Sequence, residues 1–193
     1  MNTTNQNPLS ESNRRQLLEI AGLSIEYGLT HHKHLNLNPH DYAIELQAER
    51  ASFVTLEIAN ELRGCIGHLE ANQALVCDVA ENAYSAAFHD PRFPPLGTSE
   101  RDRLSIHISV LTPAEPLTFE SEADLIEKIR PGRDGLILIE GMRRGTFLPS
   151  VWESLPDPDS FLQHLKMKAG LAAGYWSDTL QIERYETESF PDV

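Results

Sequence analysis

The sequence has little of what secreted or membrane-spanning proteins need. Its only cysteines are Cys65 and Cys77, which do not suggest a disulfide framework. Its longest purely aliphatic run covers residues 136–139, far short of the ~20 residues of a membrane-spanning helix. The first dozen residues are polar and lack the apolar centre of a signal peptide. We therefore expect a soluble protein of the reducing cytoplasm, with no membrane contact.

Positive charge is also scarce. The 193 residues contain 16 Lys and Arg against 29 Asp and Glu, a net charge of −13, and neither half of the chain is basic. Bulk charge therefore gives no support to a nucleic-acid partner. The sequence also lacks GxGxxG, GxxxxGK[ST], GxSxG, HExxH and CxxC, so nucleotide, hydrolase, zinc-protease and iron–sulfur functions lose their usual support. The sequence leaves the cofactor unknown, and delivery of a metal or cofactor through Cys65 with nearby histidines is the last-ranked hypothesis.

The apolar pattern predicts helices that alternate with hairpins. Because each half of the chain shows a hairpin followed by a helix, we expect an α+β fold with an antiparallel or mixed sheet and two β-rich halves of similar topology. The domain boundaries are expected to be a flexible segment 1–13, one domain 14–190 and a tail 191–193. The predicted elements are a helix 14–28 capped by Ser10 or Ser12 and stopped by Gly28, a loop 30–40, strands 53–58 and 62–68, a helix 72–87, a strand 106–110, a short helix after Ser121, strands 136–140 and 145–148, a helix capped by Asp159 and closed by Gly170, and a final edge strand 180–187.

The most informative run is LRGCIG at 62–67, followed by His68. Alternation along a strand places Arg63, Cys65 and Gly67 on one face. A nearby guanidinium lowers the pKa of a thiol, which makes Cys65 the candidate nucleophile. Gly64 and Gly67 permit close approach of a ligand or of another backbone segment. The competing interpretation is that Cys65 is a small buried apolar residue, as most free cysteines are.

A second candidate site is the run DPRFPPL at 90–96. Three prolines stiffen this loop enough to hold Asp90, Arg92 and Phe93 in fixed directions. Arg92 can grip a carboxylate or phosphate with two hydrogen bonds, and Asp90 can orient it or act as a base. The alternative is a helix terminator whose Asp and Arg merely pair at the surface. His68 and His89 adjoin these runs, and each is a candidate general base.

Other polar clusters are weaker candidates. The adjacent Arg143 and Arg144 indicate either a local anion site or a solvated turn. Four histidines between positions 31 and 40 share one predicted loop, whereas zinc ligands normally come from two elements, so we predict no metal site. His107 alternates with apolar neighbours and is expected on the face opposite the core.

The chain resembles the AMMECR domain family, also called AmmeMemoRadiSam system protein A, from about residue 14 to residue 190. The runs that carry the resemblance are 62–67 (LRGCIG), 82–84 (NAY), 87–88 (AF), 90–96 (DPRFPPL), 108–111 (ISVL), 134–138 (DGLIL), 145–149 (GTFLP), 151–153 (VWE), 168–171 (KAGL), 175–176 (YW) and 188–190 (ESF). One departure is Ser150, where the family often has glutamine, which puts an amide contact there in doubt.

This resemblance implies a larger and a smaller lobe around a cleft, with the Arg-Gly-Cys strand near it, and an association with a Memo-type protein and a radical SAM enzyme. It implies no particular reaction. Two hypotheses follow. In one, Cys65 is the nucleophile and Asp90 moves protons, while a small or anionic ligand contacts Arg63, Gly64, Gly67, His68, Arg92 and Phe93. In the other, the same residues form a non-catalytic binding or scaffold module for a protein or nucleic-acid partner.

Overall fold

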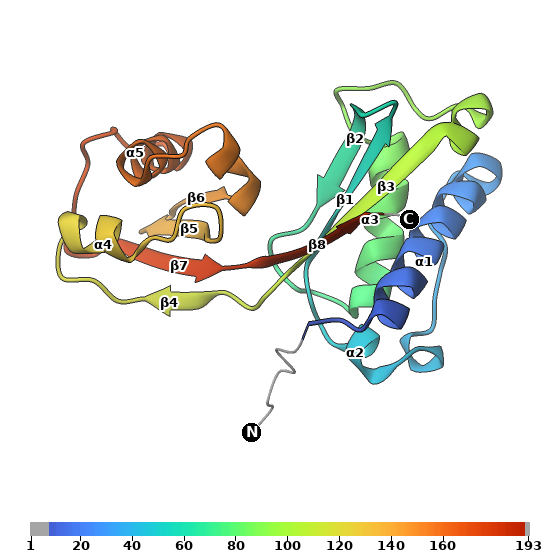
Figure 1. Cartoon of the computed structure of the whole chain (residues 1–193), viewed down its shortest axis with the longest axis horizontal. Coiled ribbons are helices and arrows are strands. Elements are labelled where there is room, and N and C mark those ends of the chain that lie inside the picture. Colours follow the sequence, from blue (N-terminus) through green and yellow to red (C-terminus); the bar gives the residue numbers. More distant parts are fainter. Residues whose placement is uncertain (1–7, 192–193) are drawn as a thin grey trace. The chain divides into compact units, whose positions relative to one another are not determined.

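The computed structural model describes residues 8–191, and within them the chain divides into two compact units (Figure 1). Unit 1 comprises the described residues up to Leu111 together with those from Glu188 onward, and unit 2 is Thr112–Thr187. Each unit holds a four-stranded sheet with helices, so the predicted α+β class is confirmed. No helix among the described residues has both the length and the apolar character needed to cross a membrane.

Unit 1 is built on a sheet with the strand order β2-β1-β3-β8. Strand β1 pairs antiparallel with both β2 and β3. Helices α1 and α3 lie on one face of this sheet (Figure 1). The elements of this unit are α1 (Glu11–His31), α2 (Ile44–Gln47), β1 (Ser52–Ile58), β2 (Glu61–Gly67), α3 (Leu75–Phe88), β3 (Leu104–Leu111) and β8 (Thr187–Pro191), with 3-10 helices at Pro39–Asp41 and Thr98–Arg103.

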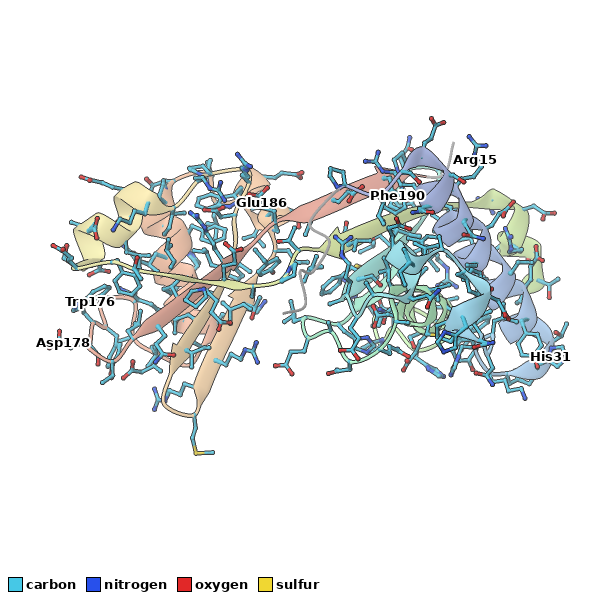
Figure 2. All side chains as sticks on the ribbon, turned by 90° about the horizontal axis from the view of Figure 1, so that it is seen from below. Arg15, His31, Trp176, Asp178, Glu186 and Phe190 are labelled. Atoms are coloured by element: carbon cyan, nitrogen blue, oxygen red, sulfur yellow. The ribbon has the colours of Figure 1, made fainter. Side chains whose placement is uncertain are left out.

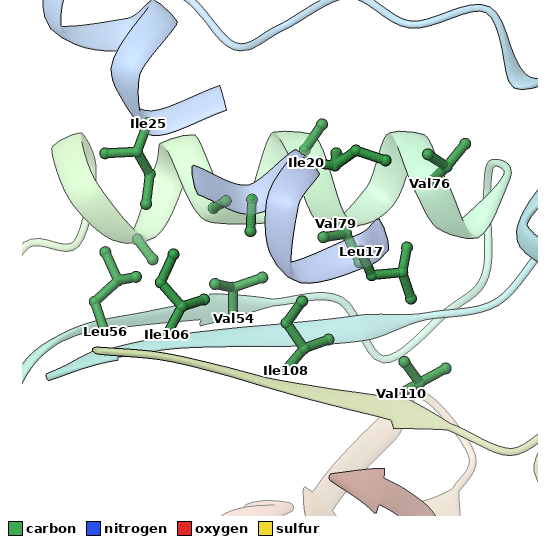
Figure 3. Close-up of a cluster of buried hydrophobic side chains, with 14 of the residues drawn as sticks. Leu17, Ile20, Ile25, Val54, Leu56, Val76, Val79, Ile106, Ile108 and Val110 are labelled. Atoms are coloured by element: carbon green, nitrogen blue, oxygen red, sulfur yellow. The ribbon is translucent and has the colours of Figure 1, made fainter. Parts of the chain in front are cut away.

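The core of unit 1 fills the space between this sheet and its two helices. Every second residue of β1 and β3 points to the helices, and all of these except Ile58 are buried, which is the expected period of a sheet covered on one face. The apolar side chains that meet there are Leu17, Ile20 and Ile25 from α1, Val76 and Val79 from α3, and Val54, Leu56, Ile106, Ile108 and Val110 from the sheet (Figure 3). The alternate residues of the strands therefore lie on the face without helices, which we call the outer face.

Unit 2 repeats the order of elements seen in unit 1. Its sheet has the order β4-β7-β5-β6, and α1-β1-β2-α3-β3 corresponds to α4-β5-β6-α5-β7. In each unit the first hairpin strand pairs antiparallel with the strand that follows the helix. The predicted similarity of the two halves is confirmed at this level. The elements are β4 (Glu115–Leu117), α4 (Glu122–Lys128), β5 (Gly135–Glu140), β6 (Arg143–Phe147), α5 (Pro158–Lys168) and β7 (Gln181–Tyr185), with a 3-10 helix at Pro149–Glu153.

Several predicted boundaries are corrected by the structure. Helix α1 passes Gly28 and ends at His31, because His32 rather than a glycine adopts the left-handed conformation that closes it. Its first turn occupies residues 11–13 of the segment predicted to be flexible, and residues 1–7 of that segment and 192–193 of the predicted tail lie outside the described residues. Asp157, not Asp159, caps α5, because Pro158 takes the first helical position.

The prediction for the last strand was also wrong in part. Residues 180–187 do not form one edge strand, since β7 lies between β4 and β5 in unit 2 and β8 forms the edge beside β3 in unit 1. Strands β4 and β8 were not predicted. Both are short and carry a proline, Pro116 and Pro191, which hides the alternation that marks a strand.

Candidate functional site

The thiol of Cys65 lies on the outer face of the unit 1 sheet. Cys65 is opposite Thr55 in the register of β1 and β2, and the Thr55 hydroxyl donates to Sγ at 3.2 Å. Residues 64 and 66 of the same strand point the other way, toward the helices, as alternation predicts. The residue is half-buried, so the structure presents a hydrogen-bonded thiol on a face that no helix of unit 1 covers.

The backbone of Cys65 is held by two side chains of the predicted Asp-Pro-Arg-Phe loop. Asp90 Oδ2 accepts the Cys65 N–H at 2.8 Å, and Arg92 Nη2 donates to the Cys65 carbonyl at 3.3 Å. Since β2 is the edge strand, this pair occupies the donor and acceptor that a further strand would take. The structure thus brings together Cys65, Asp90 and Arg92, which the sequence placed in two separate runs.

The carboxylate of Asp90 is fully committed to this clamp. Arg92 donates to it through the backbone N–H and through Nε at 3.0 Å each, and through Nη2 at 2.6 Å, while Asp90 itself is only 4% exposed. These hydrogen bonds, led by those from the Arg92 side chain, hold the pKa of Asp90 well below its ordinary value. A carboxylate of such low basicity is a poor proton acceptor, so the geometry favours a positioning role for Asp90.

Arg92 is the exposed cation of the cluster. Its side chain is 54% exposed, and its pKa is raised, mainly by the hydrogen bonds to Asp90 and further by the negative charge of Asp90. The Phe93 ring centroid lies 5.5 Å from the Arg92 guanidinium carbon and 5.8 Å from that of Arg63. The ring is therefore within cation–π distance of both guanidinium groups.

Arg63 is tied to a carboxylate that sequence analysis did not identify. Glu100 Oε1 accepts from Arg63 Nε at 2.8 Å, Glu100 Oε2 accepts from Nη2 at 3.1 Å, and Nη2 also donates to the Pro94 carbonyl. These bonds balance the charge that was expected to act on the thiol. Among the described residues, the buried Arg63 Nη1 finds no acceptor, and such a group calls for an explanation.

Both glycines of the Arg-Gly-Cys strand face their own chain rather than open space. A Cβ on Gly64 would lie 2.1 Å from the carbonyl oxygen of Ala86 in α3, and one on Gly67 would lie 2.3 Å from the Phe53 ring. The close approach expected at these positions is therefore made by backbone and side chains of unit 1. Direct ligand contact at either glycine stays a prediction.

The His68 side chain contacts Asp78 rather than Cys65. Its ring Nδ1 lies 2.7 Å from Oδ1 of the buried Asp78 in the first turn of α3, on the helix-covered side of the sheet. The second oxygen of Asp78 accepts from the N–H and hydroxyl of Ser52 and from Asn82. His68 with Asp78 thus forms a separate hydrogen-bonded pair where β2 ends and α3 begins.

The remaining predicted groups lie apart from this cluster. His89 follows α3 and contacts the Tyr84 ring edge-on. Burial raises the pKa of the Cys77 thiol, and the charge of Asp78 raises it further. His31 and Arg15 lie toward opposite ends of α1 (Figure 2). Within residues 8–191, no three His, Cys, Asp or Glu side chains are arranged to hold a metal ion. Arg143 donates to the Gly170 carbonyl at the hairpin of unit 2.

Sequence reasoning missed Thr55, Glu100 and Asp78 as members of these networks. Thr55 reaches the thiol through the strand register, which alternation alone does not fix. Glu100 and Asp78 lie 37 and 10 residues from their partners Arg63 and His68. For Glu100 the available signal was the excess of acidic residues over the few arginines.

Comparison with known proteins places the chain in a family. A model of the AMMECR1 family matches residues 18–190. A Methanothermobacter thermautotrophicus protein is 41% identical over 189 residues, covering 95% of this chain and 96% of its own. Protein MJ0810 of Methanocaldococcus jannaschii is 40% identical over 153 residues, covering 75% and 74%. The crystal structure of the uncharacterized protein PH0010 from Pyrococcus horikoshii aligns with a TM-score of 0.83 and 33% identity, over 95% of this chain and 93% of that one. The chain therefore belongs to the AMMECR1 family.

Proposed function

We propose that the protein binds a small anionic ligand on the outer face of the unit 1 sheet and uses Cys65 as a nucleophile toward it. The observation that carries this proposal is the arrangement at Cys65. Its Sγ accepts the Thr55 hydroxyl on a face without helices, while Asp90 and Arg92 fix both of its backbone polar groups. A cysteine that only filled space would not need the hydrogen bond from Thr55 to its sulfur.

Two features support an anionic ligand. The Arg92 guanidinium is more than half exposed beside the thiol, and Arg63 Nη1 is a buried donor without an acceptor among residues 8–191. A guanidinium that is held in place by a carboxylate can still offer its remaining N–H groups to a second anion. His68, Gly64, Gly67 and Phe93 are ligand contacts in this proposal only where the ligand extends beyond the thiol.

We also propose that residues 14–190 act as one domain in the cytoplasm, in a pathway with a Memo-type protein and a radical SAM enzyme. This part of the proposal rests on the resemblance of the sequence to the AmmeMemoRadiSam system. The predicted cleft is not required for it and stays a prediction.

A non-catalytic binding module is the second candidate. The observation in its favour is that the Asp90 and Glu100 carboxylates are saturated by internal hydrogen bonds, which also explains these residues as structural clamps of β2. If the protein is such a module, the Cys65→Ser variant should still bind a purified Memo-type partner. Loss of that binding would show that the thiol is needed and would argue against a module in which Cys65 only fills space.

Alkylation of single-cysteine variants tests the nucleophile. Cys77→Ala leaves only Cys65, and Cys65→Ala leaves only Cys77, whose thiol pKa is raised by burial. We expect the rate of carbamidomethylation by iodoacetamide at Cys65 to reach half its maximum at a lower pH than at Cys77. An equal or higher midpoint at Cys65 would overturn the proposed nucleophile.

The same variants test the preference for an anion. Iodoacetate carries a carboxylate that iodoacetamide lacks. Arg92 is therefore expected to raise the ratio of the iodoacetate rate to the iodoacetamide rate at Cys65 but not at Cys77. Arg92→Gln should remove that difference. A ratio at Cys65 that is no higher than at Cys77, or that survives Arg92→Gln, would count against the anion site.

A further inference from the structure

The outer face of the unit 1 sheet carries a second polar pair in line with Cys65. His107 on β3 is opposite Thr55 on β1, and Thr55 is opposite Cys65 on β2. Since directly opposite residues share a face, the three side chains form a row across three strands. Nε2 of His107 lies 3.5 Å from Oε2 of Glu57, and the two side chains are 41% and 30% exposed.

The backbone spacing of this row argues against direct activation of the thiol by the histidine. Neighbouring strands lie ~4.8 Å apart, so the backbones at Cys65 and His107 are about 10 Å apart across β1. A hydrogen bond between Sγ and the imidazole requires about 3 Å. Thr55 occupies the place between them and donates to Sγ. An acyl group on the sulfur and one water molecule beyond it would extend from Cys65 toward the imidazole.

We propose that His107, positioned by Glu57, is the general base that hydrolyses an acyl group carried on Cys65, so that the ligand is an ester or thioester. This inference rests on the proposed nucleophilic role of Cys65. In this proposal the Glu57 carboxylate, 3.5 Å from Nε2, orients the imidazole, and Nδ1 accepts the proton. His107 is then a catalytic residue, and Glu57 is a positioning residue.

The reaction has two steps, acylation of Cys65 and hydrolysis of the resulting thioester. Sγ attacks the acyl carbon, the C–S bond forms, the bond to the leaving alcohol or thiol breaks, and the proton of the Cys65 thiol ends on that leaving group. Water then attacks the thioester while His107 takes one of its protons. The C–S bond breaks, the proton returns to Sγ, and a carboxylic acid is released. Water is the only co-reactant.

The kinetics of p-nitrophenyl acetate hydrolysis test this inference on the full chain. The wild-type protein is expected to release a burst of about one p-nitrophenolate per chain and then to turn over slowly, with the acetyl group on Cys65 in the intact mass. His107→Gln should keep the burst but slow deacylation at least tenfold. Glu57→Gln should slow deacylation by a smaller factor, and the control His31→Gln, at the end of α1, should change neither step.

Each outcome decides between the two proposals. A burst whose deacylation rate is the same in His107→Gln would overturn the role of His107 and leave the nucleophile standing. Absence of acetyl-Cys65 in the wild-type protein would overturn both. Circular dichroism of His107→Gln separates a lost fold from a lost base, and if that variant is misfolded, the deacylation rate of Glu57→Gln decides the inference.

Discussion

At the scale of single residues, the Glu100 carboxylate holds Arg63 in place. Glu100 accepts two hydrogen bonds from Arg63 and one from the Gly97 N–H. These bonds, with Arg63 as the largest cause, lower the pKa of Glu100 from 4.5 to about 2. The ionised carboxylate is thus favoured in the folded protein, and its contribution to stability depends on pH.

Glu100→Gln tests this linkage. Because the folded-state pKa is the lower one, the stabilisation is complete above pH 4.5 and is lost as the pH falls toward 2. We expect the variant to lose roughly 2 kcal/mol of unfolding free energy at neutral pH, and its stability to fall less steeply than that of the wild type below about pH 5. Urea unfolding at several pH values measures both. Parallel pH curves would show that Glu100 contributes no linkage; the slope that remains in the variant belongs to the other carboxylates of lowered pKa, Asp90 among them.

At the scale of elements, an Arg-Gly pair recurs where a hairpin meets the following helix. In β2, Gly64 packs against the carbonyl of Ala86 near the end of α3. In β6, Gly145 packs against Leu165 and Ala169 at the end of α5, with Arg144 before it as Arg63 precedes Gly64. Cys65 then corresponds to Thr146 in unit 2, so only unit 1 carries a thiol at this place.

Gly64→Ala measures how tightly β2 is held against α3. The added Cβ would meet a backbone oxygen at 2.1 Å, which cannot move without shifting the helix. We expect a loss of about 3 kcal/mol in unfolding free energy. Gly97→Ala is the matched control in the same unit, since its Cβ makes only an ordinary contact at 3.5 Å with Glu100. Equal stabilities of the two variants in urea unfolding would show that the contact is loose.

Many of the helices and strands were predictable from the periodicity of apolar residues in the sequence. The two hairpins and the helices α1, α3 and α5 follow apolar patterns, and alternation correctly placed His107 on the face opposite the core and Cys65 on the face of β2 opposite to Gly64 and Ile66. The short strands β4 and β8 were not predictable, because their neighbours come from distant parts of the chain. The same limit applies to the site, where Thr55 and Glu100 depend on register and tertiary packing.

At the scale of the whole molecule, each unit has its own apolar core. One core contains Leu17, Val54 and Phe190, and the other contains Trp152, Phe161 and Leu165. In unit 2 the Trp152 ring stacks on Phe161 with centroids 3.8 Å apart. Both tryptophans, Trp152 and Trp176, belong to unit 2, whereas the 21-residue α1 and the 14-residue α3 belong to unit 1. Two spectroscopic probes therefore report on two cores.

Phe190→Ala tests whether the cores unfold separately. Phe190 is 6% exposed in the unit 1 core, so its truncation should cost about 3 kcal/mol there. We expect the urea midpoint by far-ultraviolet circular dichroism to fall, with the midpoint by tryptophan fluorescence unchanged. Ile44→Ala, at a side chain that is 69% exposed in unit 1, serves as the control. Equal shifts of both probes would mean that the chain unfolds as one cooperative unit.

The chain enters and leaves unit 2 at neighbouring residues. The Thr112 N–H donates to the Glu186 carbonyl, and the Glu186 N–H donates to the Thr112 hydroxyl at 2.8 Å. Unit 2 is thus a continuous insert whose ends meet, whereas unit 1 is interrupted between β3 and β8. During synthesis on the ribosome, the insert can complete its fold first. The thiol-bearing sheet gains its fourth strand only when β8 emerges, after the whole of unit 2, so the outer face is completed after the insert.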